Sequence, residues 1–228
     1  MPRAKTILSW DTVNWSIALR RWEPHVSFGS LDCLELGCGP GGVSLWLASK
    51  GHHVLCTDAR EPGADVKELH RRHGVANLVE YQAVDAMAMP FIASYDIIVV
   101  KSVFGEILSH YKEAGLHRAV SEIHKALKPD GKLLFAENLR GSAFHMYCRR
   151  KFLKRVEGVW TYPTLEEMLG YLSPFATMEF QTAGFLGAFG RQEWQRTLLA
   201  YADKALVPML PMESRYILAG VAGKSWPR

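Results

Sequence analysis

A glycine-rich stretch early in the chain has the residue types that hold a nucleotide-like cofactor. It reads Leu34-Glu35-Leu36-Gly37-Cys38-Gly39-Pro40-Gly41-Gly42 and lies where an apolar run turns into a helical pattern. Glycines in such a turn permit positive φ and let a bulky ligand approach the backbone, while the following helix presents unpaired amide groups. A tight loop needs glycine for its own geometry, so this stretch alone leaves a purely structural interpretation open.

Three acidic residues, one before the glycines and two after them, narrow the class of cofactor. Asp58 ends the next predicted strand, 21 residues after Gly37, where a carboxylate can accept hydrogen bonds from both ribose hydroxyls. That spacing suits nicotinamide and methionine-derived cofactors alike. Glu35 lies just before the glycines, where a dehydrogenase would keep an apolar residue, and could brace the loop or the amino acid end of the cofactor. Asp85 follows the third predicted strand and could accept a hydrogen bond from an adenine amino group.

The elements that must position these residues alternate between strand and helix. Apolar runs predict strands over 31–36, 53–57, 79–84, 97–100 and 132–137, and helical spacing predicts helices over 44–50, 66–73 and 114–127. Runs without alternation are typical of parallel strands that are covered on both faces. Two last strands are expected over 178–184 and 215–222, with helices over 164–172 and 192–206.

Together, the segment Glu35 to Gly41, Asp58 and Asp85 resemble the class I S-adenosylmethionine (SAM)-dependent methyltransferase family. In that family E/D-x-G-x-G-x-G follows strand one, an acid ends strand two and an acid follows strand three. The turn from Leu127 to Gly131 is also similar, although Asp130 stands where the family more often has a second glycine. The resemblance covers roughly residues 30–137.

The resemblance implies an α/β fold, a three-layer Rossmann-like sheet of about seven strands, mostly parallel with an antiparallel last strand, and SAM as the cofactor. The implied cofactor-binding residues are Glu35, Gly37, Cys38, Gly39, Gly41, Asp58, Ala59, Arg60, Asp85, Ala86 and Lys101. Met87 would face the adenine. Alternatives stay open for Arg60 as a solvated side chain and for Met87 as a core residue.

The chain is expected to form one methyltransferase domain with three parts. They are an N-terminal helical cap over 1–28, a SAM-binding core over 30–137, and an acceptor-side segment over 138–228 with an insertion at 186–214. About thirty residues between the last two strands are too long for a hairpin turn. We expect the insertion to lie over the rim of the active site, or else to pack on a partner in an oligomer.

Methyl transfer from a sulfonium is an in-line displacement in which alignment contributes most and a base is optional. The acceptor is expected beside the loops after strands four and five. His110 is the leading base candidate, and Glu106, four residues earlier, would share its helix face. Glu137 and His145 are further candidates. The alternatives are that His110 and His145 are exposed on helices and that Glu137 caps a strand end.

The residues after strand four exclude several subfamilies. They read Lys101-Ser102-Val103-Phe104 rather than the Asn/Asp-Pro-Pro-aromatic box of exocyclic-amine methylation, and Cys148 lacks the Pro-Cys context of cytosine carbon methylation. Lys101 occupies the position where a second strand-end acid would complete an oxygen-rich magnesium site. We therefore expect no metal.

Composition limits the partners. The chain has 228 residues, 48% of them hydrophobic, and a formal charge of only +4, so we do not expect nucleic acid as a partner without a concentrated basic patch. Its four cysteines form no CxxC pair, and no apolar run is long enough for a membrane span. These features predict a cytoplasmic protein with reduced cysteines.

Large aromatic residues and a basic segment are the candidate acceptor contacts. Trp10, Trp15, Trp22, Trp160 and Tyr162 could form a lid over a small acceptor, or could simply be core. The basic residues over 149–155 could meet a phosphate or carboxylate, or form a solvated helix face. We predict methyl transfer to a hydroxyl, with an amine second, of a small molecule such as a saccharide or natural product. Three alternatives are an RNA or protein methyltransferase, a nicotinamide-dependent oxidoreductase and a catalytically silent SAM-binding subunit.

Overall fold

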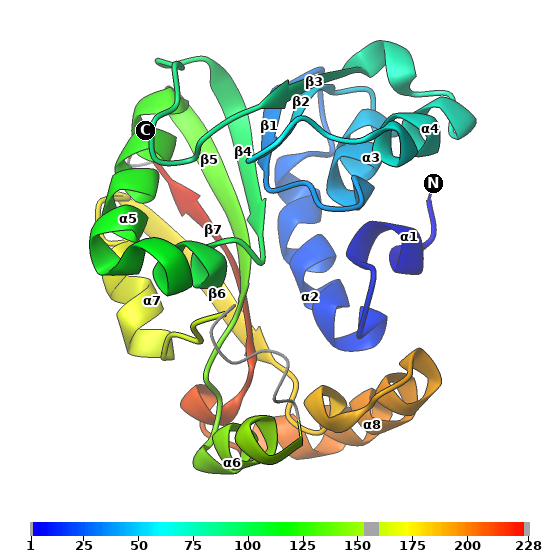
Figure 1. Cartoon of the computed structure of the whole chain (residues 1–228), viewed down its shortest axis with the longest axis vertical. Coiled ribbons are helices and arrows are strands. Elements are labelled where there is room, and N and C mark those ends of the chain that lie inside the picture. The colour runs from blue at the N-terminus through cyan, green and yellow to red at the C-terminus, as the bar shows by residue number, and fades with distance from the viewer. Residues whose placement is uncertain (1, 153–159, 226–228) are drawn as a thin grey trace.

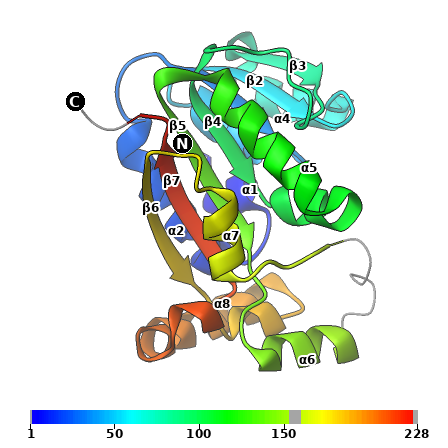
Figure 2. The ribbon, with the colours of Figure 1, turned by 90° about the vertical axis from the view of Figure 1, so that its left-hand side faces the viewer.

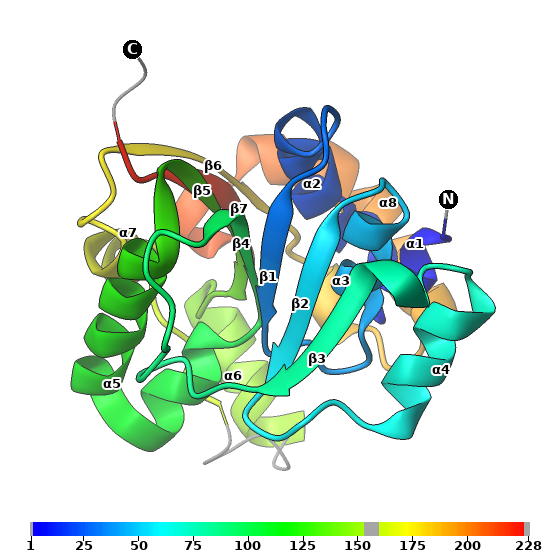
Figure 3. The ribbon, with the colours of Figure 1, turned by 90° about the horizontal axis from the view of Figure 1, so that it is seen from above.

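A seven-stranded sheet in the order β3-β2-β1-β4-β5-β7-β6 forms the centre of the structure, a computed structural model that describes residues 2–152 and 160–225 (Figure 1). Strands β1 to β5 pair in parallel, and β7 runs antiparallel between β5 and β6. Figure 3 shows the parallel half of the sheet from above. The strands are β1 (Asp32–Leu36), β2 (His53–Asp58), β3 (Val79–Ala83), β4 (Tyr95–Lys101), β5 (Leu127–Asn138), β6 (Thr177–Ala183) and β7 (Ile217–Gly223). The expected Rossmann-like sheet is therefore confirmed.

Helices cover both faces of this sheet, which explains the unbroken apolar runs. On one face lie α1 (Ala4–Leu8), α2 (Thr12–Trp22), α3 (Gly42–Ala48) and α4 (Ala64–Arg72), and on the other lie α5 (Phe104–Ala126) and α7 (Leu165–Tyr171). Alternate residues of β4 enter the two cores: Ile97 and Val99 face the first layer, and Ile98 and Val100 face the second. All four are buried, as expected for a central parallel strand.

Helix α5 starts earlier than the apolar spacing predicts and is broken near its middle. Lys112 has a φ of 59° and a ψ of −165°, so the first turns from Phe104 form a separate piece. Phe104, Ile107 and Leu108 on that piece are buried, and their packing offsets the missing continuity. The residues after β4 thus form a helix that begins at the carboxyl edge of the sheet.

Two further helices lie beyond the carboxyl ends of the parallel strands. These are α6 (Ala143–Phe152) and α8 (Glu193–Leu206), which Figure 2 shows together at one end of the sheet. Residues 149–152 of the basic segment belong to helix α6, and a helix was one of the two alternatives for this segment; Lys154 and Arg155 lie outside the described residues. Helix α8 belongs to the expected insertion, together with the short 3₁₀ helices η4 (Gly187–Phe189), η5 (Val207–Met209) and η6 (Met212–Ser214).

Two carboxylates of α8 join the insertion to the N-terminal helices: partly buried Glu193, and buried Asp203, which accepts a hydrogen bond from the Asn14 side-chain amide of α2 (3.1 Å). Glu193 accepts hydrogen bonds from the backbone N–H groups of Asp11 (2.9 Å) and Thr12 (2.8 Å) and so caps α2. Asp203, at the other end of α8, accepts from the N–H groups of residues 185–187 at 2.7–3.1 Å. The insertion therefore packs against the N-terminal cap of its own chain.

The outer face of α8 carries three exposed apolar side chains. Trp194, Leu198 and Tyr201 are 64%, 65% and 58% exposed and follow helical spacing. The expected oligomer contact through this insertion stays a prediction. Within the described ranges, none of the helices has both the length and the apolar character needed to cross a bilayer.

Candidate functional site

The glycine loop joins β1 to α3 through three glycines with positive φ. Gly37, Gly39 and Gly41 have φ values of 69°, 49° and 78°, a region that side-chain-bearing residues rarely adopt. A Cβ on Gly37 would lie 2.4 Å from the Val103 Cγ2 atom, whereas a Cβ on Gly39 would meet no atom within 4 Å. Gly37 is therefore required by packing, while Gly39 leaves open space for a ligand.

Glu35 braces this loop from beneath. Its carboxylate accepts a hydrogen bond from the Ser44 backbone N–H (2.8 Å) and another from the Ser44 hydroxyl, so it caps the first turn of α3. Burial raises the pKa of Glu35 to about 7, against the lowering effect of the Ser44 hydrogen bonds and of Lys101. Glu35 thus holds the start of α3, the helix that directly follows the loop, and its expected role in cofactor binding stays a prediction.

His70 fixes the far end of the loop, a role that the sequence did not reveal. Its Nε2 lies 2.8 Å from the Gly41 carbonyl oxygen and its Nδ1 lies 2.8 Å from the Tyr81 hydroxyl. Nε2–H therefore donates to Gly41 while Nδ1 accepts from Tyr81. Burial lowers the pKa of His70, which favours this neutral form.

A cavity of about 300 Å³ lies beside the loop, and six of the eleven predicted cofactor-binding residues line it. Asp58 lies at its edge, where its carboxylate accepts from the backbone N–H of Gly39 (3.1 Å) and of Ala59 (2.8 Å). Asp85 is exposed, with a hydrogen bond from the Met87 backbone N–H (2.9 Å). The lining residues are Leu36, Gly37, Gly39, Asp58, Ala59, Val84, Asp85, Ala86, Met87, Ser102, Val103, Glu106, Ile107, His110 and Tyr111.

Besides Glu35, four of the predicted cofactor-binding residues do not line this cavity. Cys38 is buried, with its backbone N–H bonded to the Thr57 carbonyl oxygen (2.8 Å). Gly41 is held by His70, and Arg60 is exposed and lies outside the lining. The Lys101 ammonium lies 4.9 Å from the centre of the Trp15 ring, and burial lowers the pKa of Lys101 against the opposing effect of Glu35 and Glu137. The positive charge of Lys101 therefore stabilises the two buried carboxylates of Glu35 and Glu137.

Glu137 is the N-terminal cap of α5. It is fully buried, and its Oε2 accepts from the backbone N–H groups of Val103 (3.1 Å), Phe104 (2.8 Å) and Gly105 (3.4 Å), while Oε1 accepts from Asn138 (2.8 Å). Burial raises its pKa to about 7. The carboxylate is thus engaged with backbone donors and anchors the helix that walls the cofactor cavity.

A second and larger cavity, of about 840 Å³, lies beyond the ends of β4 and β5. Ser102 lines both cavities, with a φ of 56° and with the Asn138 side-chain amide donating to its hydroxyl (3.3 Å). Ser102 therefore borders both cavities. The residues lining the second are Trp10, Ser102, Asn138, Phe144, Cys148, Trp160, Tyr162, Ala188, Phe189, Gly190, Arg191, Arg196 and Tyr216.

Of the candidate lid aromatics, three line this cavity and two do not. Trp10, Trp160 and Tyr162 contribute to its wall. Trp15 and Trp22 are fully buried in the core under the sheet, where the Trp22 indole N–H donates to the Gly220 carbonyl oxygen (3.1 Å).

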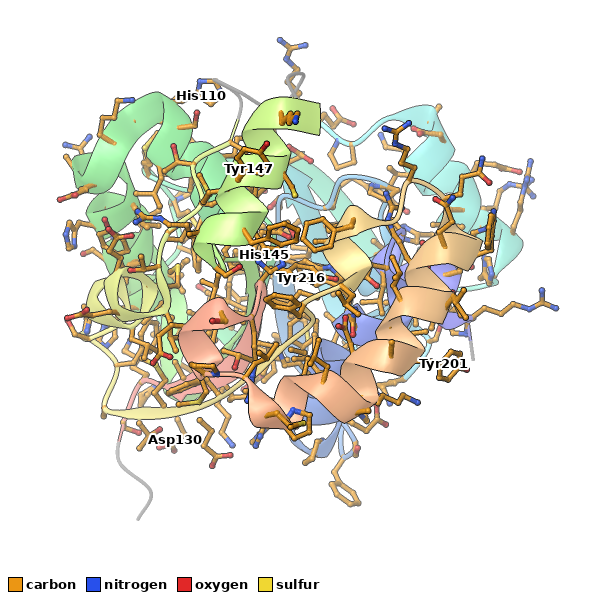
Figure 4. All side chains as sticks on the ribbon, turned by 90° about the horizontal axis from the view of Figure 1, so that it is seen from below. His110, Asp130, His145, Tyr147, Tyr201 and Tyr216 are labelled. Atoms are coloured by element: carbon orange, nitrogen blue, oxygen red, sulfur yellow. The ribbon has the colours of Figure 1, made fainter. Side chains whose placement is uncertain are left out.

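The remaining base candidates lie in two different places. His145 is 1% exposed, which contradicts the exposed alternative, and its ring nitrogens lie 2.7 Å from the Phe185 carbonyl oxygen and 2.9 Å from the Ser142 hydroxyl. Figure 4 shows it beside Tyr216, and far from His110. His110 and Glu106 are exposed and line the cofactor cavity. The choice of a base among these residues stays a prediction.

Among residues 2–152 and 160–225, no group of three or more His, Cys, Asp or Glu side chains is placed to hold a metal ion. The expectation of a metal-free reaction stays a prediction.

Known proteins resemble the chain in sequence and in fold. Residues 34–135 match a family described as a methyltransferase domain. The ubiquinone biosynthesis O-methyltransferase of Idiomarina loihiensis is 31% identical over 105 residues, which cover 45% of this chain and 40% of that protein. The chain spans about half the length of the curated relatives it matches.

Solved structures share the fold at low identity. Haemonchus contortus phosphoethanolamine N-methyltransferase 2 in complex with S-adenosyl-L-methionine has a TM-score of 0.63 at 17% identity, covering 98% of this chain and 58% of that one. The [4+2]-cyclase SpnF has a TM-score of 0.63 at 17% identity, covering 93% and 81%. Two different activities on one fold show that the fold alone does not decide the reaction.

The matched segment contains the glycine loop, Asp58 and Asp85, and the sheet has the strand order that brings them to one edge. The sequence resemblance is thereby confirmed for this segment: residues 34–135 match a methyltransferase domain and carry the glycine loop and the two acids of the class I S-adenosylmethionine-dependent methyltransferases.

Proposed function

We propose that this protein transfers the methyl group of SAM to a hydroxyl, or less readily an amine, of a small molecule held in the 840 Å³ cavity. The observation that carries the proposal is that one residue, Ser102, borders both cavities. An in-line displacement needs the acceptor atom, the methyl carbon and the sulfur on one line. We place that line beside Ser102, directly after β4, where the two cavities are neighbours.

The residues of the smaller cavity fit SAM. Gly39 leaves open the space that a Cβ would take, and Asp58 presents a carboxylate beside it. Asp58 would bind the ribose hydroxyls, Asp85 the adenine amino group, and the loop braced by Glu35 the amino acid end. When bound there, SAM supplies a methyl group activated by its sulfonium.

Alignment is the main contribution we assign to the protein. In the described lining of the acceptor cavity no His, Asp, Glu or Lys is present, so the proposal does not depend on a protein base. Orienting two reactants can supply about 7–11 kcal/mol of the barrier, whereas a base adds roughly 10²–10⁴-fold. His110 remains the base candidate to test, with Glu106 beside it in the cofactor cavity.

The surroundings of the acceptor cavity favour a small molecule over RNA or protein. Its wall includes Trp10 from the N-terminal cap, Phe144 from α6 and Phe189 from the insertion. These segments give it a concave, largely aromatic lining, as is typical of small-molecule sites. A saccharide or natural product, as expected from the sequence, remains within this proposal.

The test is methyl transfer from isotope-labelled SAM to a panel of hydroxylated and aminated small molecules, with products identified by mass spectrometry. Ala188→Phe fills the acceptor cavity without touching the cofactor cavity, so it should raise KM for an acceptor and leave affinity for S-adenosylhomocysteine (SAH) unchanged. Label found only in RNA or protein would contradict the proposal. Binding of SAM without transfer to any acceptor would instead favour the silent subunit.

A further inference from the structure

We propose that the acceptor is a flat aromatic molecule that carries an acidic group, and that Arg196 and Arg191 bind that group. This inference rests on the proposed function, because it concerns the same acceptor cavity. It goes beyond that function by naming the chemical class of the acceptor and the end of the cavity at which its charge lies.

Aromatic rings line the cavity and are held rigidly. Phe189 stacks on the buried His145 ring with centroids 5.0 Å apart and an interplanar angle of 12°, and Phe144 meets Phe189 edge-on at 5.3 Å. Trp10, Trp160, Tyr162 and Tyr216 complete the aromatic lining. Rings fixed by such contacts present flat faces and edges that suit a planar guest.

Arg196 has hydrogen-bonding capacity that the protein does not use. Its Nε is buried and has no hydrogen-bond partner. Its ion pair with Glu193 is long, at 3.7 Å, because the Glu193 carboxylate already accepts from Asp11, Thr12 N–H and the Thr12 hydroxyl. A buried guanidinium N–H without a partner costs free energy. Nε is closed to a ligand, so an anionic group would bind the terminal N–H groups, which make no hydrogen bond within the described residues.

The formal charge of the described lining is positive. Arg191 and Arg196 both contribute to it, and no Asp or Glu stands among the lining residues in the described ranges. Gly190 lets the backbone before Arg191 pack closely on Arg196, since a Cβ there would lie 2.6 Å from the Arg196 Cγ atom. An acidic acceptor would therefore meet two guanidinium groups in the lining, of which Arg196 is also paired with Glu193 at 3.7 Å.

The arginine end of the cavity is separate from the methyl site. The Arg196 guanidinium lies 5.3 Å from the centre of the Trp10 ring, Trp10 lies 5.7 Å from Trp15, and Lys101 next to Ser102 lies over Trp15. Arg196 belongs to α8 in the insertion, whereas Ser102 follows β4 and Asn138 ends β5. The acidic group of the acceptor should lie at the insertion, with the methylated atom at the other end, beside Ser102 and Asn138.

Calorimetric titration of the full chain, saturated with SAH, tests the inference without requiring turnover. The probes are 6-hydroxy-2-naphthoate, its neutral amide 6-hydroxy-2-naphthamide, and methyl glucuronide as a non-aromatic acid. We expect the naphthoate to bind at least about tenfold more tightly than either of the others, since hydrogen bonds to charged groups are the stronger ones. Equal affinity for acid and amide, or tightest binding of the glucuronide, would overturn the proposal.

Substitutions at the arginines locate the effect. Arg196→Gln and Arg191→Gln should each weaken naphthoate binding about tenfold or more and leave amide binding unchanged, while Arg118→Gln, an exposed arginine of α5 outside the lining, should change neither. The proposal would be overturned if Arg196→Gln bound neither the naphthoate nor the amide and Arg191→Gln bound the two with equal affinity. Failure of naphthoate to bind at millimolar concentration would also overturn it.

Failure of the proposed function would give a different pattern. Naphthoate that binds in an Arg196-dependent manner but is never methylated supports the inference and counts against methyl transfer. Methylation of neutral aromatic acceptors with no preference for acids supports methyl transfer and overturns the inference.

Discussion

Replacement of Glu35 by glutamine should change the pH dependence of stability in a direction that the structure specifies. Glu35 is 2% exposed, and burial raises its pKa from 4.5 to about 7 in the folded protein. A raised pKa means that the folded state holds this proton more tightly than the unfolded state does. The contribution of this proton to stability is therefore fully present below pH 4.5 and is lost as the pH rises through 7.

The size of the effect follows from the difference between the two pKa values. Each pKa unit corresponds to about 1.4 kcal/mol, so the wild-type protein should lose roughly 2–3 kcal/mol through Glu35 between pH 5 and pH 9. Glutamine keeps a carbonyl oxygen for the Ser44 backbone N–H and does not titrate. The variant should thus gain stability relative to wild type as the pH rises.

Urea unfolding at pH 5, 7 and 9 measures this difference. Because Asp11 and Glu137 also have raised pKa values, the informative quantity is the variant minus the wild type. Glu213→Gln, at an exposed position in η6, is the matched control and should follow wild type throughout. Parallel pH profiles for Glu35→Gln and wild type would refute the assignment of Glu35 as a buried, protonatable brace.

Three other substitutions test separate parts of the site. Asp58→Ala should weaken SAH binding at least about tenfold in calorimetry, because charge-assisted ribose bonds are worth roughly 1.5–3 kcal/mol. The control is Asp130→Ala, at the opposite end of β5 from Asn138. Unchanged SAH affinity of Asp58→Ala would count against the site. His110→Ala should lower kcat with little change in SAH affinity if His110 is the base; full activity would remove it from that role, and a loss confined to SAH affinity would make it a cofactor contact. Asp203→Ala should destabilise the fold by at least about 2 kcal/mol, because it leaves three backbone N–H groups without their acceptor; an unchanged urea midpoint would contradict this.

The cofactor half of the molecule could be predicted from the sequence because its determinants are local. A strand, three glycines and the next helix are adjacent along the chain, and Asp58 follows from the repeat of strand and helix. Most strand bounds differed by at most two residues: β4 was expected over 97–100 and spans Tyr95–Lys101. The exception is β5, which was expected over 132–137 but spans Leu127–Asn138 and so includes the expected turn. Apolar runs report buried strands well, whereas their ends depend on the neighbouring strands.

The acceptor half could not be predicted because its walls come from distant segments. Trp10, Trp160 and Phe189 meet only after the insertion packs on the N-terminal cap. Arg196 Nε has no hydrogen-bond partner, and the neighbouring Glu193 carboxylate instead caps a helix some 180 residues away in sequence. His145 shows the same limit, since only the fold reveals that the Phe185 carbonyl group and the Phe189 ring enclose it.

The most direct measurement of the central claim is calorimetric titration of the purified protein with SAM, SAH and NAD. The open space at Gly39 and the carboxylates of Asp58 and Asp85 predict micromolar binding of SAM and SAH and no binding of NAD. Binding of NAD alone would contradict the account and return the chain to the oxidoreductases.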